Sequence, residues 1–229
     1  MSQDLWNAVD GYICEHLLTP DPALDAALLA SEAAGLPPIA ITPNQGKLLQ
    51  LLARIHDARS ILEMGTLGGY STIWLARALA PGGRLITLER DPRFAEVART
   101  NISNAGVADV VQIRVGPALQ TLPELHDEGV GPFDMIFIDA DKQNYPGYLE
   151  WALKLSRVGT VIIGDNVVRS GDILAPGADD PSFGDGGTAA GVRRFYELLA
   201  AESRVSATAI QTVGAKGHDG FALGLVTAL

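Results

Sequence analysis

The chain has 229 residues, 47% of them hydrophobic, so it can bury a full core, and we expect one domain over residues 1–229. Its 17 basic and 27 acidic residues give a formal net charge of -10. This balance disfavours a nucleic-acid partner, because surfaces that bind phosphate need clustered Lys and Arg.

The cysteine content and the N-terminal segment predict the cellular compartment of the protein. Cys14 is the only cysteine, so an intrachain disulfide is excluded and a reducing compartment fits. Asp4 and Asp10 stand where a secretory signal has a basic region and an unbroken apolar stretch. No run of about eighteen apolar residues follows, so we expect a cytoplasmic protein without a membrane partner.

Residues 1–58 are expected to form a helical N-terminal part, ahead of a core over residues 59–229. Residues 21–36 are rich in Ala and Leu and end at a glycine followed by prolines. In the next segment, 41–57, Thr42 is placed as the N-cap, Pro43 as the first helical residue and Gln45 as the reciprocal partner of a capping box.

From Ser60 onward, short apolar runs alternate with amphipathic segments. The runs are typical of strands buried on both faces and comprise residues 60–65, 84–89, 110–115, 133–139 and 159–165. The expected helices between and after them comprise residues 70–79, 92–105, 119–128, 146–156 and 188–201. Strands and helices that alternate in this way predict a doubly wound α/β sheet with right-handed crossovers.

The tail has a different pattern. Residues 205–213 and 220–226 read as strands joined only by a short loop, which contains His218, so they must pair antiparallel. We therefore expect a Rossmann-like, seven-stranded, mainly parallel sheet with an antiparallel last strand. Residues 169–187, rich in Gly, Pro and Asp, are expected to be a mobile surface loop that covers a site.

A glycine-rich loop follows the first strand of the core. "ILEMGTLGGYST" places Glu63, Gly65, Gly68 and Gly69 where glycines let a ligand approach the backbone. Glu63 occupies the position of the first glycine in the dinucleotide pattern. A carboxylate there would repel a pyrophosphate but suits a ligand with an ammonium or sulfonium charge.

Glu89 ends the second strand, where doubly wound nucleotide sites carry the acid that binds ribose hydroxyls. Together with the glycine loop, it indicates a nucleoside with a positively charged tail, and S-adenosylmethionine has that shape. The alternative is that the glycines only make a tight turn and that Glu89 caps the following helix.

Two further strand ends carry oxygen ligands. Asp139 ends the fourth strand, and Asp165 and Asn166 end the fifth. Neighbouring parallel strands deliver these ends to the same edge, and hard oxygen donors without nearby Cys or His suit Mg²⁺ or Ca²⁺, with Mg²⁺ favoured. The alternative is that both acids are ordinary caps or loop acids; Asp141 is expected to have a structural or outer-sphere part.

These segments resemble the cation-dependent class I O-methyltransferases of the catechol and caffeoyl-coenzyme A type, bacterial and plant branch. The resemblance runs from "ITPNQGKLL" through "LEMGTLGGYSTIWLA", "TLERDP", "VGPALQTLP", "FIDADKQNY" and "GDNVV" to "GHDGFALGLV". It implies a homodimer and a metal site, with Mg²⁺, Mn²⁺ or Ca²⁺ held by Asp139, Asp165 and Asn166. It also implies a set of residues that contact S-adenosylmethionine: Thr42, Glu63, Gly65, Ser71, Glu89, Ala118 and Asp139.

Lys142 matches the lysine that acts as base in the catechol enzymes, where it and Asp139 form the catalytic pair that the resemblance implies. A phenol titrates near pH ~10 and must approach phenolate to attack a methyl group, so a nearby amine that accepts its proton helps. The alternative for Lys142 is an ion pair with Asp141 or a neighbouring acid. Arg169 departs from the family, because many relatives carry an aromatic residue soon after the "DN" pair.

The expected function is metal-assisted transfer of a methyl group from S-adenosylmethionine to a hydroxyl of a small aromatic with adjacent hydroxyls. A nicotinamide-dependent oxidoreductase is one rival, and Glu63 in the glycine loop argues against it. A scaffold that binds S-adenosylmethionine without catalysis is the other. It predicts cofactor binding without a metal and without methyl transfer to any catechol.

Overall fold

The computed structural model describes residues 2–175 and 187–228. The chain divides into two compact units, Met1–Thr121 and Leu122–Leu229, and the dividing point lies inside helix α6 (Ala118–Asp127). The expected single domain stays a prediction. In the described ranges, no helix is both long and apolar enough to span a bilayer.

The first unit opens with three helices, α1 (Gln3–Leu17), α2 (Pro22–Ala33) and α3 (Pro43–Ile55). Asp21 caps α2 by accepting hydrogen bonds from the backbone N–H groups of Ala23 and Leu24. The capping box expected at α3 is wrong. The helix does begin at Pro43, but the Thr42 hydroxyl donates to the Asn44 side chain instead of accepting from the helix.

The first unit then forms three parallel strands in the order β3-β2-β1. They are β1 (Ser60–Met64), β2 (Arg84–Glu89) and β3 (Val111–Val115). β1 and β2 are buried, but β3 is half-exposed, because it has a neighbour on one side only. The expectation that this run is buried on both faces is therefore wrong.

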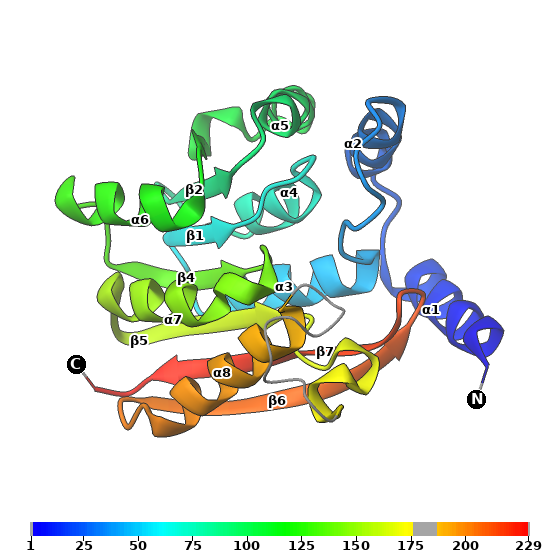
Figure 1. Ribbon diagram of the computed structural model, residues 1–229. Helices are drawn as coiled ribbons and strands as arrows, with labels where there is room; N and C mark the ends of the chain where they lie inside the picture. The colour runs from blue at the N-terminus through cyan, green and yellow to red at the C-terminus, as the bar shows by residue number, and fades with distance from the viewer. Residues whose placement is uncertain (1, 176–186, 229) are drawn as a thin grey trace. The chain divides into compact units, whose positions relative to one another are not determined.

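Helices α4 (Tyr70–Ala76) and α5 (Pro92–Asn104) pack against β2, and a short 3₁₀ turn, η1 (Ala108–Val110), precedes β3 (Figure 1). Asp91 caps α5, as expected. α4 ends three residues before the expected Leu79, because Arg77 closes it as the C-cap. Every residue of α4 is buried, which makes this short helix part of the core.

The second unit contains β4 (Phe133–Ile138), β5 (Ser156–Asp165), β6 (Val205–Gly214) and β7 (Gly217–Val226), in the order β4-β5-β7-β6. β4 and β5 are parallel, whereas β7 pairs antiparallel with both β5 and β6. The antiparallel pairing of the tail is thus confirmed. The turn between β6 and β7 contains only Ala215 and Lys216, so His218 lies in a strand and not in the expected loop.

Helices α7 (Tyr145–Lys154) and α8 (Thr188–Ala201) pack against each other, α7 on β4 and β5 and α8 on β6 (Figure 1). Two 3₁₀ segments, η2 (Lys142–Asn144) and η3 (Arg169–Leu174), follow the ends of β4 and β5. Part of the expected loop 169–187 is therefore assigned to a 3₁₀ segment, although Arg169, Ser170 and Gly171 have positive φ angles and break its helical geometry. Residues 176–186 of this loop lie outside the described residues. The expectation that the loop covers a site concerns this part and stays a prediction.

Candidate functional site

The loop between β1 and α4 depends on its glycines. Gly65 and Gly69 have φ angles of 100° and 83°, which residues with a side chain rarely adopt. A Cβ atom at Gly68 would lie 2.0 Å from the Ser31 Oγ, so a larger residue would collide with α2. The loop thus brings bare backbone to the carboxyl end of β1.

Glu63 is fully buried at the end of β1. Its carboxylate accepts hydrogen bonds from the hydroxyls of Ser71 (2.6 Å) and Thr72 (2.5 Å), both in the first turn of α4. These bonds stabilise a buried charge that would otherwise be costly. Glu63 and Ser71, both expected to contact the cofactor, contact each other here, and their cofactor role stays a prediction.

Glu89, at the end of β2, joins two loops. One carboxylate oxygen accepts a 2.8 Å hydrogen bond from the Leu67 N–H in the glycine loop, and the other accepts one of 2.8 Å from the Asp91 N–H. Glu89 therefore holds Asp91, which is itself the N-cap of α5, so Glu89 is not the helix cap of the alternative interpretation. A carboxylate has about four acceptor positions, so it retains capacity for ribose hydroxyls.

The two remaining cofactor candidates of this unit stand at element starts. Thr42 directly precedes α3 and is half-buried, and Ala118 is the first residue of α6 after β3. Neither position has a contact that assigns it a ligand, so both roles stay predictions.

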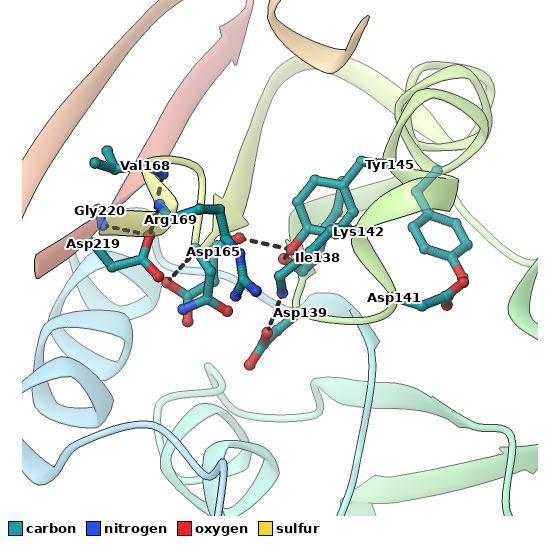
Figure 2. A network of polar contacts seen from close by, with 12 residues as sticks. Ile138, Asp139, Asp141, Lys142, Tyr145, Asp165, Val168, Arg169, Asp219 and Gly220 are labelled. Carbon is teal, nitrogen blue, oxygen red and sulfur yellow. Dashed lines mark hydrogen bonds and ion pairs between the residues drawn. The ribbon is translucent and has the colours of Figure 1, made fainter. Parts of the chain in front are cut away.

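In the second unit, the carboxyl ends of β4 and β5 lie side by side. Ile138, the last residue of β4, is in register with Gly164, so Asp139 directly follows β4 and Asp165 is the last residue of the neighbouring β5. Figure 2 shows both side chains from these strand ends together with Lys142. The structure therefore brings together the two acids that the sequence places at adjoining strand ends.

Tyr145 holds these two ends together, a role that the sequence did not suggest. Its hydroxyl lies 2.9 Å from the Ile138 carbonyl and 2.8 Å from the Asp165 carbonyl, although it has a single proton to donate. The ring is completely buried, and this burial raises the pKa of Tyr145 well above its usual value. The phenol is therefore neutral and acts as a donor.

Lys142 forms an ion pair with Asp139, with the Nζ 2.8 Å from the Oδ1. Its ammonium also lies 4.9 Å from the centre of the Tyr145 ring. The ion pair matches the alternative given for Lys142, a bond to a neighbouring acid. It leaves the second oxygen of Asp139 available to another ligand.

Asp141 stabilises the turn that carries Lys142. Its carboxylate accepts hydrogen bonds from the Asn144 side chain and from the Tyr148 hydroxyl. This arrangement fits the structural part expected for Asp141.

Asn166 follows β5 with a φ of 55°, and its N–H donates to the Asp165 Oδ1 at 2.9 Å. The segment after it is held by Asp219 of β7, whose Oδ1 accepts from the N–H groups of Val168, Arg169 and Gly220 at 3.1, 3.0 and 3.0 Å. Asp219 thereby fixes the backbone that carries Asn166 and Arg169 (Figure 2).

Lys216, on the turn between β6 and β7, adds a positive charge near the acids. Its side chain is exposed, yet desolvation by nearby protein atoms lowers its pKa, while the carboxylates of Asp139 and Asp165 oppose that shift. The opposing effect shows that this turn lies within electrostatic range of both strand ends.

The donor set fits a hard divalent cation. Among the residues that the structure describes, no group of three or more His, Cys, Asp and Glu side chains is arranged to hold a metal ion. The expected set comprises two carboxylates and an amide oxygen, and Mg²⁺ takes one or two carboxylates and fills its octahedron with water and substrate oxygens.

The chain is similar to known methyltransferases over nearly its whole length. Residues 25–224 match the family model described as O-methyltransferase. A catechol O-methyltransferase of Niastella koreensis is 52% identical over 226 residues, which cover 99% of this chain and 100% of the relative.

Two solved structures agree with these sequence matches. The O-methyltransferase from Bacillus cereus in complex with SAH has a TM-score of 0.93 and 54% identity, covering 99% of this chain and 100% of its own. The O-methyltransferase TomG from Streptomyces achromogenes, in complex with SAM, has a TM-score of 0.92 and 53% identity with full coverage of both chains. This likeness confirms the expected fold class. The chain is therefore an enzyme of the O-methyltransferase family.

Proposed function

We propose that the enzyme transfers the methyl group of S-adenosylmethionine to one hydroxyl of a small aromatic with adjacent hydroxyls, and that a divalent cation assists. The observation that carries this proposal is the pair of strand ends after β4 and β5, tied by Tyr145 and bearing Asp139 and Asp165 beside Lys142. The similarity to a catechol O-methyltransferase over 99% of the chain supports the choice of acceptor.

S-adenosylmethionine is proposed as the methyl donor because two solved relatives of about half identical sequence contain SAM or SAH. The glycine loop and Glu89 support the proposal, since bare backbone and a carboxylate suit a nucleoside with a cationic tail. The residues assigned to the cofactor remain Thr42, Glu63, Gly65, Ser71, Glu89 and Ala118, with Asp139 toward its amino group.

Asp139, Asp165 and Asn166 would hold the cation. When bound, such an ion lowers the pKa of the oxygen that it coordinates and neutralises charge on it. Mg²⁺ is proposed first, with Mn²⁺ or Ca²⁺ as replacements. A homodimer and a cytoplasmic location remain predictions from the sequence.

In this proposal, Lys142 first loses one proton to solvent and then, as the neutral amine, accepts the proton of the acceptor hydroxyl at its Nζ. Asp139 orients the amine, since their 2.8 Å contact fixes where the Nζ lies, and a buried turn held by Asp141 restricts it further. The remaining contribution is positional, because an oxygen held in line with a sulfonium methyl gains most from orientation.

Transfer of labelled methyl from S-adenosylmethionine to catechol tests the proposal, with Mg²⁺, with EDTA and after Mg²⁺ is restored. We expect turnover only when the ion is present. Unchanged turnover in EDTA would remove the metal from the mechanism, and SAH binding without transfer to any vicinal diphenol would favour the scaffold.

Asp165→Ala separates chemistry from cofactor binding. We expect it to lower kcat by about 100-fold or more, since a coordinated cation stabilises the transition state by several kcal/mol, and to leave the Kd for SAH within about twofold. Asp172→Ala, which changes an exposed acid of η3 in the same unit, is the matched control and should keep full activity.

A further inference from the structure

Arg169 differs from three other arginines of its unit. Its side chain is half-buried, three residues beyond Asn166, and across residues 2–175 and 187–228 it makes no side-chain hydrogen bond, while its backbone N–H donates to Asp219. In the same unit, Arg157, Arg194 and Arg204 each form an ion pair with a carboxylate. Within that part of the chain, the guanidinium of Arg169 has no protein anion as partner.

The backbone at Arg169 is held in an unfavourable conformation. Its φ is 55°, as is that of Ser170, and residues with a Cβ rarely enter this left-handed region because the Cβ clashes with the backbone. The Asp219 carboxylate imposes this conformation through its bonds to the N–H groups of Val168 and Arg169. The direction of the Arg169 side chain is therefore set by β7.

That direction leads to the acids. Figure 2 shows the Arg169 side chain running from its Asp219 anchor past Asp165 toward Lys142 and Asp139. Lys216 also lies within electrostatic range of Asp139 and Asp165.

Positive charge exceeds negative charge here once a cation binds. Asp139 already pairs with Lys142, and Asp139 and Asp165 both act on the charge of Lys216, whereas the Arg169 guanidinium pairs with neither acid. A divalent ion held by the acids would add two positive charges. An acceptor that carries a negative charge in addition to its ionised hydroxyl would offset more of this excess than an acceptor without one.

We propose that Arg169 is a specificity-determining residue that pairs with a carboxylate on the aromatic acceptor. The proposal rests on the proposed function and narrows its substrate class to catechols that carry an acidic group, such as a dihydroxybenzoate. A guanidinium binds a carboxylate with two parallel N–H bonds, so it fixes the orientation of the ring as well as its charge.

The test compares 3,4-dihydroxybenzoate with its methyl ester, which has the same ring and hydroxyls but no charge. Steady-state kinetics with S-adenosylmethionine and Mg²⁺ are measured for the wild type, Arg169→Gln, Arg169→Lys and Arg194→Gln. The last variant removes an exposed arginine of α8 and serves as the control. Calorimetry on the full chain loaded with SAH and Mg²⁺ gives the Kd of the acid without turnover.

We expect the wild type to prefer the acid. Arg169→Gln should raise the KM and the Kd for the acid by about tenfold or more, since a charge-assisted bond contributes about 1.5–3 kcal/mol. The ester should change by less than about twofold, Arg169→Lys should recover part of the acid preference, and Arg194→Gln should match the wild type.

An acid-to-ester ratio that stays unchanged in Arg169→Gln, or an equal loss with both acceptors, would overturn the role of Arg169 while leaving methyl transfer intact. If the wild type methylates neither compound, the proposed function itself fails. The Kd of the acid then still decides on Arg169, because an unchanged value in Arg169→Gln would refute the contact.

Discussion

The Oε2 of Glu89 accepts a 2.8 Å hydrogen bond from the backbone N–H of Leu67. Leu67 lies in the glycine loop with a φ of 50°, a conformation that a leucine does not adopt without support. The acid that ends β2 therefore shapes the loop that follows β1. Binding of a ligand to the glycine loop and binding of a ligand to Glu89 would therefore both depend on the hydrogen bond between Leu67 and Glu89.

Glu89→Ala should weaken SAH binding by about tenfold or more, because a hydrogen bond to a charged group contributes about 1.5–3 kcal/mol. Calorimetric titration with SAH measures the change. Glu96→Ala alters an exposed acid of α5 in the same unit and should bind as the wild type does. Equal affinities for wild type and Glu89→Ala would remove Glu89 from the cofactor site.

Tyr145→Phe should lower the free energy of unfolding by about 1–3 kcal/mol, because the buried carbonyls of Ile138 and Asp165 lose their shared donor. Urea denaturation measures this difference. Tyr12→Phe is the matched control, since Tyr12 is 64% exposed on α1, and it should change stability by less than about 0.5 kcal/mol. A Tyr145→Phe variant as stable as the wild type would show that the hydroxyl does not join the strand ends.

Gly191→Ala should disturb the turn that carries Lys142. A Cβ at Gly191 of α8 would lie 2.2 Å from the Lys142 carbonyl oxygen, so the backbone must move, at a cost of about 1–3 kcal/mol. We expect a lower denaturation midpoint and a lower kcat. Gly11→Ala, with no atom within 4 Å of the added Cβ, should instead stabilise α1 by up to about 1 kcal/mol. If Gly191→Ala turned over as fast as the wild type, the packing of α8 would not determine the position of Lys142.

The start of α5 should become less stable in acid. The side-chain hydrogen bond from Arg93 lowers the pKa of Asp91 from 3.8 to about 2. A carboxyl group with a lowered pKa contributes stability that is fully present above its unfolded pKa and is lost as the pH falls through the folded one. The difference in denaturation midpoint between the wild type and Asp91→Ala should therefore shrink between about pH 4 and about pH 2.

Salt should reduce the difference in denaturation midpoint between the wild type and Asp91→Ala, because the Asp91–Arg93 pair is exposed and screened by ions. A difference that stays constant down to about pH 2 would show that the Asp91 carboxylate is not involved.

The strands could be predicted because apolar runs record burial directly. The run at 133–138 is buried at every position, and the turn-bounded tail made the antiparallel pair at β6 and β7 predictable. The sequence does not record which strand has a free edge, so the exposure of β3 was missed. The capping box failed because Asn44, two residues after Thr42, accepts a hydrogen bond from the same hydroxyl.

The candidate site also contains residues whose place could be predicted from the sequence and residues whose place could not. Asp139 and Asp165 could be placed because each directly follows an apolar run, and parallel neighbours bring such ends together. Asp219 and Tyr145 could not, since their partners lie up to 51 and 20 residues away and depend on how β7 and α7 pack. The influence of Asp139 and Asp165 on Lys216 could not be predicted, because it depends on the two-residue turn between β6 and β7.

The Tyr145 hydroxyl has one proton for two carbonyl acceptors, so it can donate to only one of Ile138 and Asp165 at a time. Rotation of the hydroxyl about its C–O bond transfers the hydrogen bond from the end of β4 to the end of β5 without moving the buried ring. The two strand ends therefore compete for the same proton.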